Sequence, residues 1–246
     1  MKYLITFSYD GSKFYGYEKQ INKRTVQGEI EEKLKIINNK KVSMVSSGRT
    51  DRGVHALNQK AHFNLDINIS LDKLKTALNS LLDGDIYIKD ITTVDDNFHA
   101  RFDVLKKEYL YVINVGEYNP IAKDYIYQYC HKLDVLNIRK ATKYFIGTLN
   151  YKSFTCGQDK RDNYVRTIFN IKVKEKKNTV YISFIGDGFM RYQVRNMIGF
   201  LLDVGSGKRE AKEVKKVIIL EDRTTASLTA PACGLYLKQV YYKKNK

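Results

Sequence analysis

The sequence predicts an α+β fold built from two similar halves, each a mainly antiparallel sheet with helices on one face. Segments of alternating apolar and polar residues, typical of strands, occur between segments whose apolar residues recur at helical spacing. The same mixture of strands and two helices occurs twice along the chain. No short fixed repeat is present, which excludes a solenoid.

In the first half, residues 2–9 alternate like a strand and residues 10–13 are typical of a turn. Thr25 is suited to cap a helix, because apolar residues recur at helical spacing up to Ile37 and acidic residues occupy the early turns. The other expected elements are a strand at 60–65, a helix capped by Ser70, and a strand at 85–94.

The second half is expected to contain four strands and three helical segments. The strands are predicted at 108–115, 168–173, 179–185 and 234–242, and the helices at 135–145, around 194–202 and at 209–220. With only two prolines and no Gly/Ser-rich stretch, no flexible linker is expected. We therefore divide the chain into residues 1–103 and 104–246, which we expect to share an interface.

Composition narrows the classes of function. The 246 residues include 43 Lys and Arg against 27 Asp and Glu, a net charge of +16, and 43% are hydrophobic, which excludes a disordered chain. The excess charge predicts an acidic partner, nucleic acid first and an anionic membrane second. Three widely spaced cysteines indicate neither a disulfide framework nor a zinc site. No signal peptide or membrane span is recognisable, so we expect a cytoplasmic protein.

Residues 46–56 are the segment most suited to chemistry. Asp51 lies between Arg49 and Arg52, and neighbouring positive charges would keep its carboxylate ionised. An ionised Asp can serve as a nucleophile, a base or a metal ligand. A metal site using Asp51 and His55 is disfavoured, because no second acidic cluster is nearby and the arginines would compete with a cation. From chemistry alone, a structural ion pair in a loop remains the favoured alternative.

A set of motifs along nearly the whole chain resembles the motifs of one known protein family. The central one is Gly48-Arg49-Thr50-Asp51-x-Gly53-Val54-His55-Ala56. The others, in the order of the family, include Tyr9-Asp10-Gly11-Ser12, Thr25-Val26-Gln27-Gly28, Phe98-His99-Ala100-Arg101-Phe102, Tyr109-x-Tyr111, Val194-Arg195-Asn196-Met197 and Ala230-Pro231-Ala232-x-Gly234-Leu235. These motifs resemble those of the TruA family of tRNA pseudouridine synthases. The resemblance implies the pseudouridine synthase fold, in which the two halves form a central basic cleft.

The resemblance also implies a reaction that uses neither metal nor cofactor. Asp51 matches the family nucleophile, Tyr109 the tyrosine that stacks on the target base, and Arg195 the arginine that pairs with the catalytic Asp. Arg49 matches an arginine proposed to fill the space left by a flipped base, and Arg52 and Leu235 are expected to bind substrate as well. His55 and His99 are interpreted as residues that pack the loops.

The implied substrate is the anticodon stem-loop of tRNA (tRNA positions 38–40), and a homodimer is expected to bind it. No membrane is expected as a partner. The chain departs from the family pattern at Arg52, which replaces Ala, at Tyr17-Glu18, which replaces Trp-Gln, and along 189–193. These changes leave two alternatives open: a paralogue acting on another structured RNA such as 23S ribosomal RNA, and an RNA-binding module without catalysis. A metal-dependent nuclease is a third class.

Overall fold

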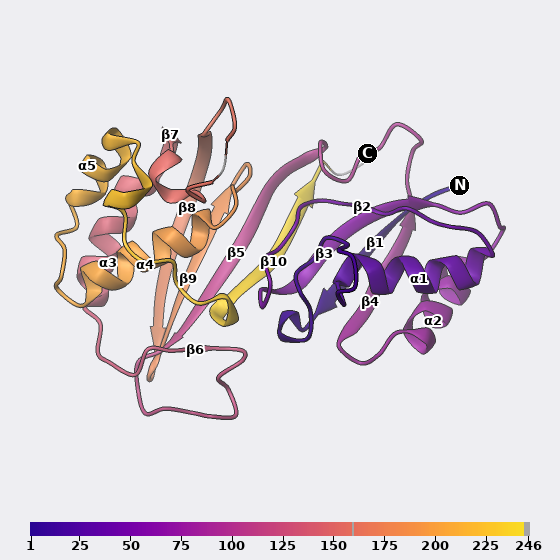
Figure 1. Cartoon of the computed structure of the whole chain (residues 1–246), viewed down its shortest axis with the longest axis horizontal. Helices are drawn as coiled ribbons and strands as arrows, with labels where there is room; N and C mark the ends of the chain where they lie inside the picture. The colour runs from indigo at the N-terminus through magenta and orange to yellow at the C-terminus, as the bar shows by residue number, and fades with distance from the viewer. Residues whose placement is uncertain (159, 244–246) are drawn as a thin grey trace. The chain divides into compact units, whose positions relative to one another are not determined.

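A computed structural model describes residues 1–158 and 160–243 (Figure 1). By its internal contacts the chain divides into two compact units. The first contains Met1–Leu105 together with the C-terminal segment from Tyr236, and the second contains Lys106–Leu235. The expected division placed the last strand with the second half, whereas the contacts group nearly all of it with the first unit.

The first unit is a sheet with the strand order β4-β1-β3-β10. Its strands are β1 (Lys2–Tyr9), β3 (His55–Asn64), β4 (Ile86–Thr93) and β10 (Leu235–Tyr242), and the short β2 (Val45–Ser46) pairs with β3. β1 is antiparallel to both of its neighbours, whereas β10 runs parallel to β3. A register shift between Phe7 and Tyr9 in the β1–β3 pairing lies just before the segment that follows β1.

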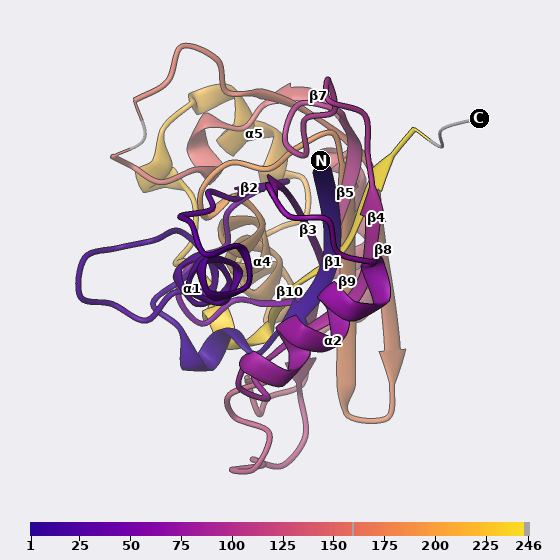
Figure 2. The ribbon, with the colours of Figure 1, turned by 90° about the vertical axis from the view of Figure 1, so that its right-hand side faces the viewer.

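Two helices, α1 (Val26–Asn38) and α2 (Leu71–Leu81), lie beside each other on one face of this sheet (Figures 1 and 2). Both begin where the sequence predicts, because the Thr25 and Ser70 side chains accept hydrogen bonds from the N–H groups of Gly28 and Lys73. Their buried faces consist of the periodic apolar residues, for example Ile30, Leu34, Leu74 and Leu78.

The second unit has the strand order β5-β9-β8-β7. The strands are β5 (Val104–Asn114), β7 (Gly147–Asn150), β8 (Val165–Lys176) and β9 (Thr179–Gly186), and β6 (Tyr127–Gln128) pairs with β5. The helices are α3 (Val135–Thr142), α4 (Gln193–Gly205) and α5 (Glu213–Leu220). Nearly every residue of α4 is buried, and Phe200 on α4 meets Phe145 and Phe154 in an edge-to-face cluster. This helix is the centre of the unit's core.

Five short 3-10 helices complete the described part of the chain: η1 (Gly11–Lys13), η2 (Lys143–Phe145), η3 (Lys152–Phe154), η4 (Arg223–Thr225) and η5 (Ala232–Gly234). The α+β prediction is confirmed. The helix expected at 209–220 begins only at Glu213. The Glu213 carboxylate accepts the N–H of Glu210, a contact typical of a helix start, and Arg209 lies before this start with its side chain donating to the carbonyl of Thr225. β2, β6 and β7 were not predicted, because two to four residues show no measurable alternation.

Candidate active site

Asp51 lies on a tight turn between β2 and β3. The N–H of Val54 donates to the carbonyl oxygen of Asp51 at 3.1 Å, and Gly53 takes a positive φ of 79° that suits glycine. Asp51 itself is partly exposed, whereas Thr50 before it and Val54 after it are buried. The turn therefore presents the carboxylate on a backbone that is anchored on both sides.

Thr50 is the main anchor of this turn. Its Oγ1 shares a buried hydrogen bond of 2.7 Å with the hydroxyl of Tyr9, and its carbonyl accepts the N–H of Tyr17 at 3.1 Å. Burial raises the pKa of Tyr9 well above its ordinary value, so the hydroxyl stays protonated. Gly16 has a φ of 99°, and a Cβ there would lie 3.3 Å from the Thr50 carbonyl oxygen. Sequence reasoning gave Tyr9 no role in the site, although it opens a matched motif.

The other side of the loop is fixed by Gln59 on β3. The Ser47 hydroxyl donates to Gln59 Oε1 at 2.6 Å, and Gln59 Nε2 donates to the Gly48 carbonyl at 2.9 Å. Both side chains are fully buried. Because buried polar groups with partners resist displacement, these bonds hold the start of the loop in place.

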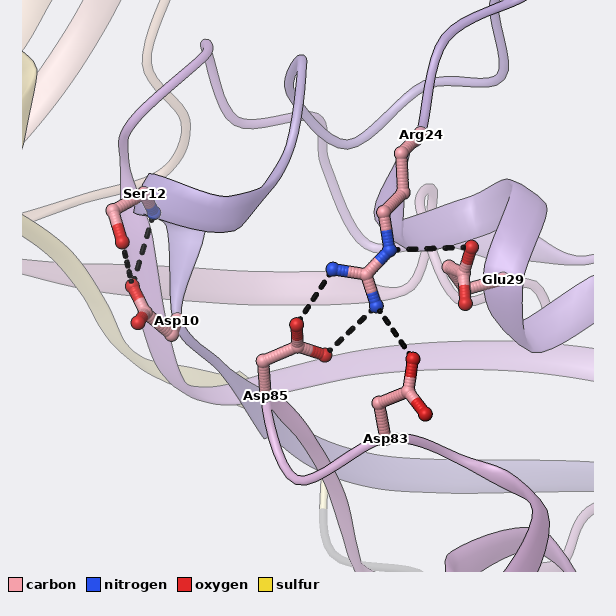
Figure 3. A network of polar contacts seen from close by, with 6 residues as sticks. All are labelled: Asp10, Ser12, Arg24, Glu29, Asp83 and Asp85. Atoms are coloured by element: carbon pink, nitrogen blue, oxygen red, sulfur yellow. Dashed lines mark hydrogen bonds and ion pairs between the residues drawn. The ribbon is translucent and has the colours of Figure 1, made fainter.

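The segment from Tyr15 to Arg24, here called the hairpin, packs against the Asp51 turn. Its ends are joined by the N–H of Tyr15 donating to the Arg24 carbonyl at 2.9 Å. The Arg24 guanidinium then binds Asp85 through both Nη atoms, at 2.6 and 3.2 Å, and also meets Asp83 and Glu29 (Figure 3). A bidentate pair fixes the plane of the guanidinium, so the base of the hairpin is held to the start of β4.

Two side chains of the hairpin contact the arginines that flank Asp51. Arg49 Nη1 is 2.7 Å from Glu18 Oε2, and the Arg52 guanidinium lies 4.4 Å from the centre of the Tyr15 ring. The sequence predicts that both arginines keep Asp51 ionised, and the structure gives each guanidinium a partner from the hairpin. Neither contact was predicted, since the partners are far from the motif in sequence.

Tyr109 lies on β5 of the second unit and is 8% exposed. Its ring meets Phe189 edge to face at 5.3 Å, and across the strand pair it lies opposite Phe184. Tyr109, Tyr111 and Ile113 are all buried, as their shared face predicts. Sequence reasoning placed Phe189 in a family motif and at the start of the departing run 189–193, but it predicted no contact between Phe189 and Tyr109.

Arg195 lies in the first turn of α4 and is partly exposed. Its Nε donates to the carbonyl of Ala230 at 2.7 Å, and its guanidinium lies 5.1 Å from the centre of the Tyr192 ring. Tyr192 takes a positive φ of 63° just before the helix. The expected substrate contact Leu235 is buried at the start of β10, after a segment fixed by the Tyr111 hydroxyl donating to the Pro231 carbonyl at 2.7 Å.

The contacts of His55 are those of a packing residue. It is buried, its Nδ1 accepts the N–H of Gly11 at 3.1 Å, and its ring stacks on Tyr236 at 4.7 Å. Its interpretation as a packing residue agrees with these contacts.

Within residues 1–158 and 160–243, no group of three or more His, Cys, Asp or Glu side chains could hold a metal ion. None of the helices in the described residues is long and apolar enough to cross a membrane.

A family model described as tRNA pseudouridine synthase matches residues 5–103 and 141–243. The chain belongs to this family. Proteins named tRNA pseudouridine synthase A are similar over almost the full length: 42% identity with that of Limosilactobacillus reuteri, over 99% of this chain and 98% of the relative, and 41% with that of Bacillus subtilis, over 98% and 99%. The corresponding protein of Caldicellulosiruptor bescii is 40% identical over 97% of this chain and 98% of its own length.

Among solved structures, a chain in a Cbf5-Nop10-Gar1 complex aligns with 97% of this chain and 59% of its own length, at 13% identity and a TM-score of 0.39. This likeness is too low to support an argument. Membership of the tRNA pseudouridine synthase family rests on the two matched segments and on the full-length relatives. Both matched segments contain candidate residues, since Asp51 falls in the first and Arg195 in the second.

Proposed function

We propose that this protein converts uridine to pseudouridine in the anticodon stem-loop of tRNA, with Asp51 as the nucleophile. The observation that carries the proposal is the Asp51 turn itself. The turn lies in a segment that matches the tRNA pseudouridine synthase family, Asp51 on it is partly exposed, and its backbone is anchored through Thr50 to two buried tyrosines. An anchored backbone limits the rearrangement that the Asp51 carboxylate needs before it attacks.

The reaction is an isomerisation that requires no cofactor. The bond from ribose C1′ to N1 of uracil breaks, the base turns, and a bond from C1′ to C5 forms. C5 loses its proton and N1 gains one, so atoms and electrons balance. In this proposal Asp51 attacks either the base or the sugar carbon, Tyr109 stacks on the uracil, and Arg195 supports the ionised carboxylate.

The remaining proposed roles concern RNA binding. Arg49 and Arg52 contact the RNA beside the target nucleotide, and Leu235 packs near the base. A uridine in a stem must leave its stack at a cost of a few kcal/mol, and an arginine that stacks and binds phosphate recovers part of that cost. We further propose that residues 1–103 supply the catalytic motif, that residues 104–246 complete the RNA-binding cleft, and that the protein acts as a cytoplasmic homodimer.

Tritium release from tRNA labelled at C5 of uridine tests the reaction. The wild-type protein should release tritium in the presence of a chelator, and Asp51→Asn should release none above background. Asp95→Asn is the matched control, because Asp95 is an exposed Asp of the same unit, and it should match wild type. Absence of release by the wild type, or release by Asp51→Asn, would refute the proposal.

The substrate and the assembly need separate measurements. A pseudouridine map of tRNA and ribosomal RNA from cells with and without the protein should lose signal in the anticodon stem-loop. Loss confined to ribosomal RNA would refute the tRNA assignment and favour the paralogue that acts on ribosomal RNA. Sedimentation should show a dimer, and a monomer at working concentration would refute the proposed assembly.

A further inference from the structure

The segment 226–230 holds Arg195 by both its side chain and its main chain. Arg195 Nε donates to the Ala230 carbonyl at 2.7 Å, while the Ala230 N–H donates to the Arg195 carbonyl at 3.1 Å. Because Nε links the aliphatic part of the side chain to the planar guanidinium, a hydrogen bond there restricts the rotation of the whole group. The orientation of Arg195 therefore depends on where Ala230 is placed.

Arg223 is the residue that places this segment. Its Nη1 donates to the carbonyls of Ala226 and Ser227 at 3.3 and 3.0 Å. Its Nη2 donates to Thr229 Oγ1 and to Asn196 Oδ1, both at 3.1 Å. One guanidinium thus contacts three of the four residues that precede Ala230.

Thr229 and Asn196 connect Arg223 to the helix that bears Arg195. The Thr229 hydroxyl donates to Asn196 Oδ1 at 2.6 Å. Asn196 is fully buried and follows Arg195 on α4, and its Nδ2 donates to the carbonyls of Phe154 and Thr155 at 2.8 and 3.1 Å. We call Arg223, Thr229 and Asn196 the clamp.

The fit between the segment and α4 leaves no free space. A Cβ on Gly199, one turn after Arg195, would lie 1.8 Å from the Leu228 carbonyl oxygen. The segment therefore lies directly on the helix, and a small change in the clamp must shift Ala230 relative to Arg195.

The partners of Arg223 are unusual for an arginine. All of them within the described residues are neutral carbonyl, amide or hydroxyl oxygens, and burial lowers the pKa of the guanidinium. A partly buried cation without a carboxylate gains less than one in an ion pair, whereas four directed hydrogen bonds define geometry well. The arrangement is better suited to positioning than to stabilising.

We propose that Arg223 is a positioning residue, which acts through Thr229 and Asn196 to set the orientation of the Arg195 guanidinium for uridine isomerisation. This inference rests on the proposed function. It assigns to the clamp an effect on the rate of the chemical step and none on the affinity for RNA.

The test compares Thr229→Val with Thr229→Ser. Valine has nearly the shape of threonine but lacks the hydroxyl through which the segment bonds to both Arg223 and Asn196, whereas serine keeps it. Under single turnover on saturating tRNA, Thr229→Val should be slowed about 10- to 100-fold, because a misplacement of about 1 Å can have that effect. Its Kd for tRNA should stay within twofold of wild type, and Thr229→Ser should restore most of the rate.

A second measurement does not depend on activity. In protein labelled with 15Nε-arginine, the Hε of Arg195 should exchange slowly with solvent in wild type and in Thr229→Ser, and faster in Thr229→Val. If Thr229→Val keeps the wild-type rate, or loses tRNA affinity with the rate unchanged, the positioning role is wrong. If the wild-type protein releases no tritium, the proposed function fails, and the exchange rates still decide whether the clamp orients Arg195.

Discussion

Neutralising Glu18 should strengthen RNA binding at the rim of the Asp51 turn. Glu18 Oε2 lies 2.7 Å from Arg49 Nη1, and the two side chains are 56% and 59% exposed. If Arg49 contacts RNA, its guanidinium must exchange the Glu18 carboxylate for a phosphate. Glu18→Gln removes the competing carboxylate and its repulsion toward phosphate, and it keeps the size of the side chain.

The magnitude follows from the exposure of the pair. An ion pair this open to water contributes about 0.2–1 kcal/mol, and about 1.4 kcal/mol corresponds to a tenfold change in Kd. Glu18→Gln should therefore tighten tRNA binding by about 1.4- to 5-fold at low salt. The gain should shrink at high salt, because the screening length falls from about 10 Å at 0.1 M toward about 3 Å at 1 M.

Fluorescence anisotropy with labelled tRNA measures the change, and two controls define its origin. Glu32→Gln removes the same charge from an exposed position on α1, so it accounts for the effect of net charge alone. Glu18→Gln combined with Arg49→Ala should show no gain over Arg49→Ala. An equal gain in Glu32→Gln, or a gain that survives the loss of Arg49, would refute the reasoning.

Three further predictions concern stability and RNA contacts. Burial, together with the nearby positive charges, lowers the pKa of His62 to about 4. As the pH falls, the imidazole is therefore protonated in the unfolded chain before it is protonated in the folded protein. The stability present above about pH 6.5 should fall by about 2–3 kcal/mol by pH 4.5, and urea unfolding should show a flatter pH dependence in His62→Asn. Gly11→Ala should cost about 1–3 kcal/mol in thermal unfolding, because its Cβ would lie 2.0 Å from a carbonyl oxygen. Arg52→Ala, which removes the guanidinium from Tyr15, should lower the salt dependence of tRNA binding by about one unit of slope.

Each of these has a result that contradicts it. An unchanged pH dependence in His62→Asn would mean that another group titrates over this range. The control for Gly11 is Gly84→Ala, where a Cβ meets nothing within 4 Å, and equal losses at both positions would exclude the steric explanation. An unchanged salt slope for Arg52→Ala would show that this arginine meets no phosphate.

The elements that were predicted correctly are those with local signals. Thr25 and Ser70 cap the helices that their spacing predicts, because a capping hydroxyl reaches a backbone N–H only three residues away. The Asp51 turn was located for a similar reason, since glycine and charged residues concentrate there. The longer strands were also found, but β3, β5 and β8 begin three to five residues earlier than expected, whereas the others begin within one residue of the predicted position. For example, β3 starts at His55, where pairing with β10 extends it beyond the alternating pattern.

By itself, the sequence determined the α+β class, the principal helices and strands, the family resemblance, and the choice of Asp51, Tyr109 and Arg195 as candidates. Only the tertiary structure decided which side chains hold them. Tyr9 shares a hydrogen bond with Thr50, and Arg223 donates hydrogen bonds to the segment that holds Arg195. In the sequence, Tyr9 is 41 residues from Thr50, and Arg223 is 28 residues from Arg195. Periodicity reports which face of an element is buried, whereas a hydrogen bond between distant segments depends on how the chain brings them together.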